Sequence, residues 1–295
     1  MPPWHRAPVG ARTACGFIDP GQCARGRGAI ACRHPDRGPD FGAAPPQRSL
    51  PRVAVFSRPP TPGSPLAQEP CLSCGARADS VCNAIEDADL GRLAAFAVVS
   101  EVQPGQTFIE EGDPADSFFN LTAGSAKLYK LMTDGRRQIT GFVGRGHFLG
   151  LAVSATYAFS AEAIEPVRLC RFSRVRMFRL LGEFPALERR LLERAATELV
   201  AAQEQMLLLG RKTARERVAS FLDVLCRPGA GPCGRAAPVV ALPMSRSDIA
   251  DYLGLTIETV SRTLSRLRSE GLIEIPSPTT IRICDPARLA ALASG

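Results

Sequence analysis

The stretch from Ser245 to Gly271 constrains the fold of this chain more than any other, because it predicts two short helices joined by a tight turn. Ser245 is a good N-cap residue, and Asp248 three positions later completes a pattern like a capping box. Gly254 can take the left-handed conformation that ends the first helix, and Thr256 stands where it would cap the second. One face of the second helix is apolar and is predicted to be buried, since its members recur at helical spacing: Ile257, Val260, Leu264 and Leu267.

The opposite face of the second helix is polar and carries Glu258, Ser261, Arg262, Ser265 and Arg266. A helix that buries one side and offers a carboxylate, a hydroxyl and guanidinium groups near its N-terminus suits the major groove of DNA. Packing alone is the alternative interpretation, because amphipathic helix pairs with a glycine turn are common. The following residues favour DNA binding, since 272–283 predict a β-hairpin wing and a helix-turn-helix with a wing is a winged helix.

Two further periodic patterns precede this stretch. From residue 98 to about residue 172 the chain predicts short alternating strands separated by glycine-containing turns, which is typical of an antiparallel sandwich or roll. From residue 187 the period becomes helical, and apolar residues are spaced three and four apart as in a coiled-coil seam: Leu192, Ala195, Leu199, Ala202, Met206 and Leu209. Because charged residues flank this narrow seam, pairing with a second copy is the favoured interpretation, and packing within one chain is the alternative.

Charge and composition limit the possible location and partners of the protein. The chain of 295 residues has a net charge of +7, but positions 1–70, with nine Arg and four acidic residues, account for five of these charges. The basic balance is therefore weak evidence for nucleic acid. No apolar run approaches the ~20 residues of a membrane span, and the N-terminus lacks the apolar segment of a signal peptide. We expect a cytoplasmic protein without a membrane partner, in which cysteines among the ten more often bind metal or do redox chemistry than form disulfides. Seven basic residues are candidates to contact phosphates: Arg211, Lys212, Arg215 and Arg217, together with Arg262, Arg266 and Arg268.

The order of these patterns predicts an α+β protein with four parts. Residues 1–68, rich in Pro, Gly, Ala and Arg, form a disordered or over-extended N-terminal tail. Residues 69–184 combine a cysteine-containing segment with an N-terminal antiparallel β-roll that acts as the sensor domain. Residues 185–212 form a long dimerisation helix, and residues 213–295 form a C-terminal winged helix-turn-helix DNA-binding domain. Three cysteines of the tail are interpreted as incidental thiols: Cys15, Cys23 and Cys32.

A β-roll, a dimer helix and a winged helix in this order resemble the CRP/FNR superfamily of transcription regulators. The resemblance extends from about Cys71 to Gly295 and is sharpest at ETVSR, residues 258–262, within LGLTIETVSRTLSRLRSEGLI. It implies a homodimer that reads double-stranded DNA with an inverted repeat of TTGAT-like half-sites, and that acts as an activator with RNA polymerase. By the same resemblance, Glu258, Ser261 and Arg262 touch base edges, and Thr256 and Arg266 join them as DNA-binding residues. Arg can bond guanine and Glu can accept from cytosine, so the residue types suit this role.

The part of the roll that would hold a cyclic nucleotide departs from the family pattern. Nucleotide-binding members have a Gly-Glu pair and a later Arg-Ser/Thr-Ala string, whereas here 146–151 contain no Glu and 158–162 contain no Arg. A cyclic phosphate needs a cation or several aligned N–H donors, and the acidic Glu162 would oppose it. Nucleotide sensing is therefore not expected.

Four cysteines resemble the ligands of the FNR-type oxygen sensors: Cys71, Cys74, Cys82 and Cys170. That resemblance, to the rhizobial-type branch with C-x2-C-x7-C spacing, implies a [4Fe–4S] cluster, for which thiolates are suitable ligands. It implies a regulator of anaerobic or microaerobic genes that responds to oxygen or to redox state. A short segment with few large apolar residues cannot fold alone, so the cluster is expected to hold it against the roll. Because Ala202 leaves the middle of the seam uncharged, we expect oxygen to dissociate the dimer only in part.

Several alternatives remain open for these thiols. One is a cluster-free regulator of the same family, of the FixK kind or sensing a small molecule. Another, from a different class, is a zinc or thiol-redox protein, and inert cysteines are a third. No Ser/His/Asp set, paired carboxylates or phosphate-binding glycine loop supports catalysis, so we do not expect an enzyme. Three other cysteines are interpreted as bystanders: Cys226, Cys233 and Cys284.

Overall fold

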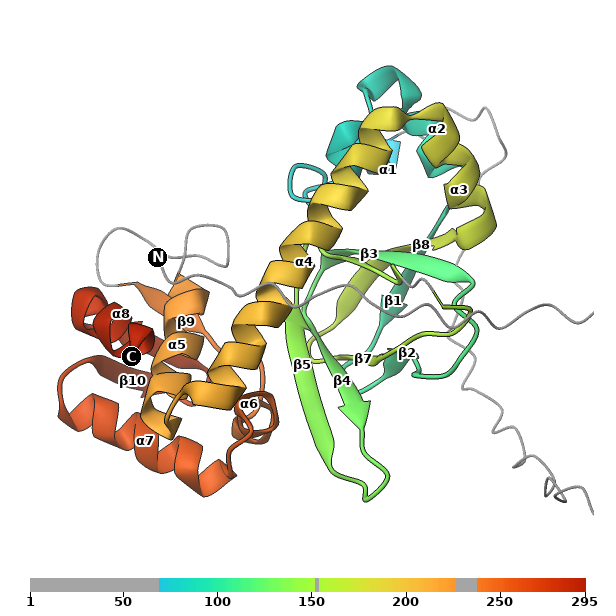
Figure 1. Ribbon diagram of the computed structural model, residues 1–295. Helices are drawn as coiled ribbons and strands as arrows, with labels where there is room; N and C mark the ends of the chain where they lie inside the picture. The colour runs from blue at the N-terminus through green and yellow to red at the C-terminus, as the bar shows by residue number, and fades with distance from the viewer. Residues whose placement is uncertain (1–68, 152–153, 227–237) are drawn as a thin grey trace, which may run out of the picture. The chain divides into compact units, whose positions relative to one another are not determined.

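The computed structural model describes residues 69–151, 154–226 and 238–295, which belong to one unit spanning 51–295. The tail 1–68 with its three cysteines, and also Cys233, lie outside the described residues. Within them the chain combines antiparallel sheets, a long helix and a helix-turn-helix with a wing (Figure 1). The predicted fold class is confirmed, because the α+β architecture and the order of its parts are those expected from the sequence.

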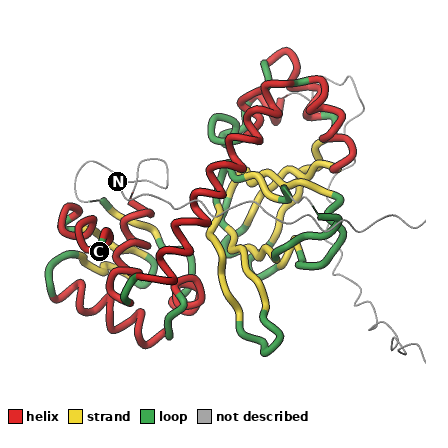
Figure 2. The backbone as a smooth tube through the Cα atoms, in the orientation of Figure 1, coloured by secondary structure: helices red, strands yellow, loops and turns green. Residues whose placement is uncertain are grey.

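The roll consists of two antiparallel sheets with strand orders β1-β8-β3-β6 and β2-β7-β4-β5. Figure 2 shows these strands and the turns between them. Their facing sides enclose an apolar core that includes Ile109, Leu121 and Leu169, each at most 2% exposed. The turn at Gly124 requires glycine, since its φ is +79° and a Cβ would collide with the backbone of Pro166. The strands are β1 (Ala97–Val102), β2 (Thr107–Ile109), β3 (Ser117–Ala123), β4 (Ala126–Leu131), β5 (Arg137–Val143), β6 (Phe148–Leu149), β7 (Ser160–Ala163) and β8 (Val167–Ser173).

A second apolar layer covers the other face of the sheet that contains β3. Side chains alternate along a strand, so Phe119 and Leu121 enter the core between the sheets while Phe118 lies in this outer layer. There it packs with Val81 and Met177. The elements of the layer are α1 (Glu69–Leu72), η2 (Val81–Ala84), η3 (Asp87–Asp89), α2 (Leu90–Ala94) and α3 (Arg174–Glu183). Helix α3 lies between the predicted strands, which end at about residue 172, and the predicted helical period, which begins at residue 187.

Helix α4 (Pro185–Arg211) has 27 residues and leaves most of its apolar seam uncovered. Leu192, Leu199 and Met206 are 65%, 60% and 64% exposed, whereas Leu187, Leu191 and Leu208 are buried. The described residues of one chain therefore do not provide the packing that the seam calls for. Burial of exposed apolar residues at this spacing requires a further surface.

The C-terminal part is a winged helix-turn-helix, as the sequence predicts. The capping box of Ser245 and Asp248 is present, Gly254 ends the first helix in the left-handed conformation (φ +61°), and Thr256 caps the second. The wing has three strands rather than a two-stranded hairpin, in the order β10-β11-β9. The elements are α5 (Ala214–Cys226), β9 (Val239–Ala241), α6 (Arg246–Leu253), α7 (Ile257–Ser269), β10 (Ile273–Ser277), β11 (Thr280–Ile283) and α8 (Pro286–Ser294).

Among the described helices, none is at once long enough and apolar enough to span a membrane.

Candidate functional site

Four cysteines from two distant parts of the chain come together in the outer layer of the roll. Cys71 lies in α1, Cys74 in the turn that follows it, and Cys82 in η2, while Cys170 lies in the middle of β8. Cys71, Cys82 and Cys170 pack against the same apolar cluster, and all four thiols are close enough to influence one another's ionisation. The structure thus gathers the four thiols that the sequence singles out.

The setting of Cys71, Cys82 and Cys170 opposes the ionisation of their thiols, because burial raises the pKa of each. Burial first, and then the neighbouring sulfurs of Cys82, Cys71 and Cys74, raise the pKa of the Cys170 thiol to about 12, against a weaker opposite effect of Arg168. Burial also raises the pKa of Cys82 to about 11, although its hydrogen bond with the Ser80 side chain acts in the opposite direction. Without a positive centre the buried sulfurs therefore stay protonated at neutral pH. A thiolate is the form that binds metal, so iron would stabilise what burial disfavours.

The donor set suits an iron–sulfur cluster by its chemistry. Four soft thiolates from protein are what a [4Fe–4S] cluster takes, one for each iron. Across the part of the chain that the structure describes, no three or more His, Cys, Asp or Glu side chains are grouped to hold a single metal ion. Ligands of four separate irons stand farther apart than the ligands of one ion, so the two kinds of site need different arrangements.

The cysteine segment is attached to the rest of the roll by more than its sulfurs. Arg145, in the turn between β5 and β6, donates to the Asp79 carboxylate at 3.1 Å, whereas the bonds of Arg77 and Ser80 lie within residues 77–87 and order the segment itself. The segment also comes very close to the turn at Gly146, where a Cβ would lie 2.7 Å from that of Asp79. The expectation that the cluster alone holds the segment is therefore incomplete, because packing and polar contacts hold it too.

The same segment contacts the long helix. Val81 and Ile85 pack in one cluster with Leu187 and Leu191 of α4, and the Arg194 guanidinium donates to the carbonyl of Asp79. The elements η2 and α4 are therefore in direct contact. A change in the cysteine segment can act on α4 without an intermediate element.

The predicted DNA-reading helix α7 presents a polar, exposed face. Its predicted base-contacting side chains Glu258, Ser261 and Arg262 are exposed, while Val260, Leu264 and Leu267 are buried. Backbone N–H groups at the helix N-terminus, then the Thr256 hydroxyl and Arg262, lower the pKa of Glu258, so its carboxylate is ready to accept hydrogen bonds. The predicted buried stripe is wrong at one residue. Ile257, in the first turn of the helix, is 45% exposed because it lies beyond the edge of the domain core.

Thr256 and Arg266 have structural contacts besides any role on DNA. The Thr256 hydroxyl accepts from the Thr259 N–H at 3.2 Å and so caps α7. Arg266 pairs with Glu270 at 3.0 Å, and the same carboxylate also pairs with Arg215. Arg266 is still exposed, so it would exchange this surface contact for a phosphate or base at small cost.

Of the four basic residues at positions 211–217 that are proposed to contact phosphates, three have hydrogen-bond or ion-pair partners within the protein. Arg217 donates to the carbonyls of Leu209, Lys212 and Leu253 at 2.9 Å each, which ties the α4–α5 junction to the end of α6. Lys212 bonds the Ser220 hydroxyl at 2.9 Å, and Arg215 pairs with Glu270. These internal partners compete with phosphates for the same donors, so the phosphate contacts of these residues stay a prediction. The sequence shows only that these residues are cationic, whereas the fold also brings backbone carbonyls at helix ends within reach of the same donors.

Glu162 is also placed differently from its sequence interpretation. Its carboxylate does not face an empty phosphate site, because Lys127 Nζ lies 2.9 Å from Glu162 Oε1 and 2.9 Å from Asp248 Oδ1. Arg137 completes the network by bonding Asp248 at 3.1 Å and Asp251 at 3.0 Å. This network joins strands β4, β5 and β7 of the roll to helix α6. No sequence motif marks it, since its members are far apart in the chain.

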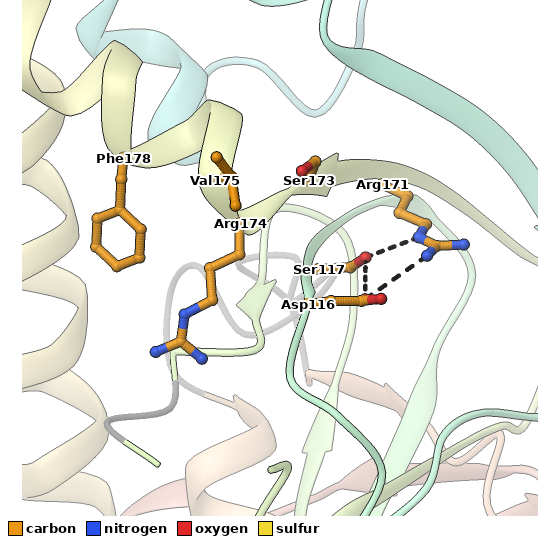
Figure 3. Close-up of a pocket in the computed structure, with 7 residues that line it drawn as sticks. All are labelled: Asp116, Ser117, Arg171, Ser173, Arg174, Val175 and Phe178. Atoms are coloured by element: carbon orange, nitrogen blue, oxygen red, sulfur yellow. Dashed lines mark hydrogen bonds and ion pairs between the residues drawn. The ribbon is translucent and has the colours of Figure 1, made fainter. Parts of the chain in front are cut away.

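The structure also has a cavity of about 440 Å³ at the junction of β8 and α3, which sequence reasoning does not predict (Figure 3). Arg171 donates to the Ser117 hydroxyl at 2.9 Å and pairs with Asp116, so its charge is partly neutralised by another residue that lines the cavity. Figure 3 shows these three side chains on one side of the cavity and Phe178 on the other. The lining is completed by Ser173, Arg174 and Val175.

Comparison with known proteins places these features in context. A family model for the cyclic nucleotide-binding domain matches residues 99–184, and one for the Crp-like helix-turn-helix domain matches residues 216–292. The nitrogen fixation regulation protein FixK of Bradyrhizobium diazoefficiens is 44% identical and the match covers 76% of this chain and 94% of the relative. The transcriptional activator protein FnrL of Cereibacter sphaeroides is 38% identical, with 74% and 90% covered. The solved structure of FixK2 from Bradyrhizobium japonicum is similar with a TM-score of 0.63 at 37% identity, covering 68% of this chain and 98% of that one.

Proposed function

Because this chain belongs to the CRP/FNR family of transcription regulators, we propose that it is an oxygen- or redox-responsive activator that senses through a [4Fe–4S] cluster. The family resemblance in the sequence is confirmed, and its relatives are regulators rather than enzymes. The observation that carries the proposal is that Cys71, Cys74 and Cys82 lie near Cys170, all four half-buried, at the outer apolar layer of the roll. When bound, the cluster supplies an oxygen-sensitive centre. The four cysteines hold it, and the apolar layer around them limits access of water.

Recognition of DNA is the function proposed for α7. Its exposed face offers an ionised carboxylate at Glu258, a hydroxyl at Ser261 and a guanidinium at Arg262. These groups match the donor and acceptor patterns of base edges in the major groove. Thr256 and Arg266 flank them at the two ends of the same face. We expect the operator to be an inverted repeat with TTGAT-like half-sites, because two copies of the helix would be related by a two-fold axis.

The homodimer is supported by the uncovered seam of α4. Leu199 and Met206 are more than half exposed and stand on one helical stripe with Ala202. A second copy of the helix would bury this stripe in a coiled coil. We further expect a cytoplasmic location and contact with RNA polymerase, as for an activator.

The contact between the cysteine segment and α4 supports a route from sensor to DNA. Val81 and Ile85 pack on Leu187 and Leu191, so the position of the segment affects the first half of the dimer helix. A cluster that binds only one arrangement of the segment would favour one arrangement of the paired helices. The two copies of α7 would then be held at the spacing that an inverted repeat requires.

A cluster-free regulator of the FixK kind is the second candidate. It is favoured by the similarity to FixK of Bradyrhizobium diazoefficiens and to the FixK2 structure. In that case the four thiols would pack as small apolar residues, which the raised pKa values of Cys71, Cys82 and Cys170 permit.

Anaerobic purification followed by iron and sulfide analysis and absorption spectroscopy tests the proposal. The wild type should contain four irons per chain, and Cys74→Ala and Cys170→Ala should lose the brown chromophore together with anaerobic promoter activation. Cys284→Ala is the matched control, because Cys284 is exposed on the winged domain. A colourless, iron-free wild type that still binds an inverted TTGAT repeat in a gel shift would leave the FixK-like candidate standing. Failure to bind that repeat would overturn the proposed operator.

A further inference from the structure

One polar side chain is buried among the apolar residues beside the cysteines. Asn120 in β3 is 1% exposed, and its neighbours in the outer layer include Phe118, Phe148 and Phe172. An asparagine is disfavoured both in a strand and in an apolar interior, because its amide must find hydrogen-bond partners away from water. A leucine of nearly the same shape would fill the position without this demand. The presence of an amide therefore needs a local explanation.

The position of Asn120 connects the two sources of cysteines. On one side its Cα pairs in register with that of Cys170 on β8, and on the other with that of Phe148 on β6. Its amide nitrogen Nδ2 lies 3.9 Å from Cys82 Sγ and donates to that sulfur. One side chain thus adjoins the cysteine of the strand and contacts a cysteine of the N-terminal segment.

The other end of the amide is unsatisfied. Asn120 Oδ1 is buried and has no hydrogen-bond partner among the residues that the structure describes. The amide is therefore not placed to complete a network of the roll itself. Its hydrogen bond goes to a sulfur, and such a bond is weak while the sulfur is a neutral thiol. It becomes a charge-assisted bond once the sulfur is a thiolate.

We propose that Asn120 is a positioning residue for the iron–sulfur cluster, donating its N–H to the Cys82 sulfur when that sulfur is a ligand. This inference rests on the proposed function and assigns a role in the cluster site to a residue other than the four cysteines. A hydrogen bond to a ligand sulfur stabilises the more negative, reduced state of the cluster and raises its reduction potential. The cluster is then harder to oxidise. Asn120 would in this way set how readily oxygen triggers the regulator, in addition to orienting Cys82.

The test compares Asn120→Leu with the wild type and with a matched control. Leucine keeps the shape and removes the donor, while Asn120→Ala serves if leucine disturbs folding. Thr122→Val is the control, because Thr122 lies on the same strand and its hydroxyl donates to the Arg168 carbonyl at 3.0 Å rather than to a cysteine. The substitution therefore removes a hydrogen-bond donor without changing a contact to sulfur. Circular dichroism of the metal-free proteins establishes that each variant folds. After anaerobic reconstitution, the measurements are the midpoint potential, the Fe–S stretching frequencies by resonance Raman, and the rate of cluster loss in air.

We expect Asn120→Leu to bind the cluster on the order of tenfold less tightly, because loss of a hydrogen bond to a metal ligand commonly lowers affinity by that much. Its midpoint potential should be lower, its Raman bands shifted and its loss in air faster, while Thr122→Val matches the wild type. Variants with unchanged potential, Raman bands and rate of loss would overturn the role of Asn120 and leave the cluster in place. A wild type that takes up no cluster under the same conditions would instead overturn the proposed function, and this inference with it.

Discussion

Replacing Lys127 by methionine should reduce the free energy of unfolding by about 3 kcal/mol. The Lys127 side chain is only 9% exposed, and its ammonium lies 2.9 Å from carboxylate oxygens of both Glu162 and Asp248. Methionine keeps most of the apolar stem and removes the charge. Removing one partner from a buried ion pair typically costs about 3–5 kcal/mol, because the remaining charge is left unpaired. The lower end applies here, since Arg137 still bonds Asp248 at 3.1 Å.

Urea unfolding at pH 7 measures this cost, and Lys130→Met is the matched control. Lys130 lies on the same strand and pairs with Glu111 at 2.7 Å, but its side chain is 51% exposed. A surface pair of this kind is worth about 0–1 kcal/mol. The two substitutions remove the same charge and differ in burial, so the difference in unfolding free energy isolates the buried network.

The cost of Lys127→Met should also depend on pH. Burial by itself raises the pKa of Asp248, but hydrogen bonds from Ser245 and Lys127 outweigh it and hold the pKa below its ordinary value. A carboxyl group of this kind contributes stability above its unfolded pKa of about 3.9, and the contribution is lost as pH falls through the lower folded value. The difference between wild type and variant should therefore be largest near neutral pH and shrink in acid below about pH 4. Equal, small costs for Lys127→Met and Lys130→Met at pH 7 would refute the reasoning.

The other predictions concern DNA, the dimer and the thiols. Arg262→Ala should relax discrimination at one base position by about 1–3 kcal/mol, whereas Arg211→Ala should weaken binding to all sequences and lower the salt slope by about one; gel shifts at several salt concentrations separate the two. Ala202→Glu should dissociate the dimer in analytical ultracentrifugation, while the wild type stays largely dimeric even after exposure to air, so that a monomeric air-exposed wild type would contradict the seam argument. In metal-free protein at pH 8, iodoacetamide should label Cys82 and Cys170 slowly, because their pKa values of about 11 and about 12 keep them protonated, and rapid labelling measured by mass spectrometry would contradict this.

The parts of the fold that the sequence predicts best are those held by local interactions. The capping box from Ser245 to Asp248, the left-handed Gly254 and the Thr256 cap lie within twelve residues, and all three are present. Their signals depend on hydrogen bonds between near neighbours, so no knowledge of the tertiary fold is needed. The proximity of Cys170 to the N-terminal thiols cannot be predicted from local interactions. It follows from family resemblance, because alternation along β8 predicts the face of Cys170 but nothing near it in the chain indicates which segment covers that face.

The features that the sequence misses depend on tertiary contacts. Lys127 and Asp248 are 121 positions apart, and Glu162 looks like an isolated acid until β4 and β7 pair. Arg217 reads as a surface cation but binds three carbonyls that only the packed helices bring within reach. Asn120 reads as an ordinary polar residue of a strand, since alternation predicts its face but not that the face is covered. In each case the sequence identifies the group and the fold decides its partner.

The way in which the cysteine segment is attached bears on how complete an oxygen response can be. The ion pair of Arg145 with Asp79 is exposed and therefore worth little, at about 0–1 kcal/mol. Burial of Val81 and Ile85 against Leu187 contributes more, because each fully buried aliphatic side chain adds about 1.5–3 kcal/mol. Loss of a cluster would remove the bonds to sulfur but leave this apolar contact with α4 in place. The segment would then loosen around its thiols while its second half stays on the dimer helix. Together with an uncharged seam at Ala202, this favours a graded change in helix alignment over separation of the two copies.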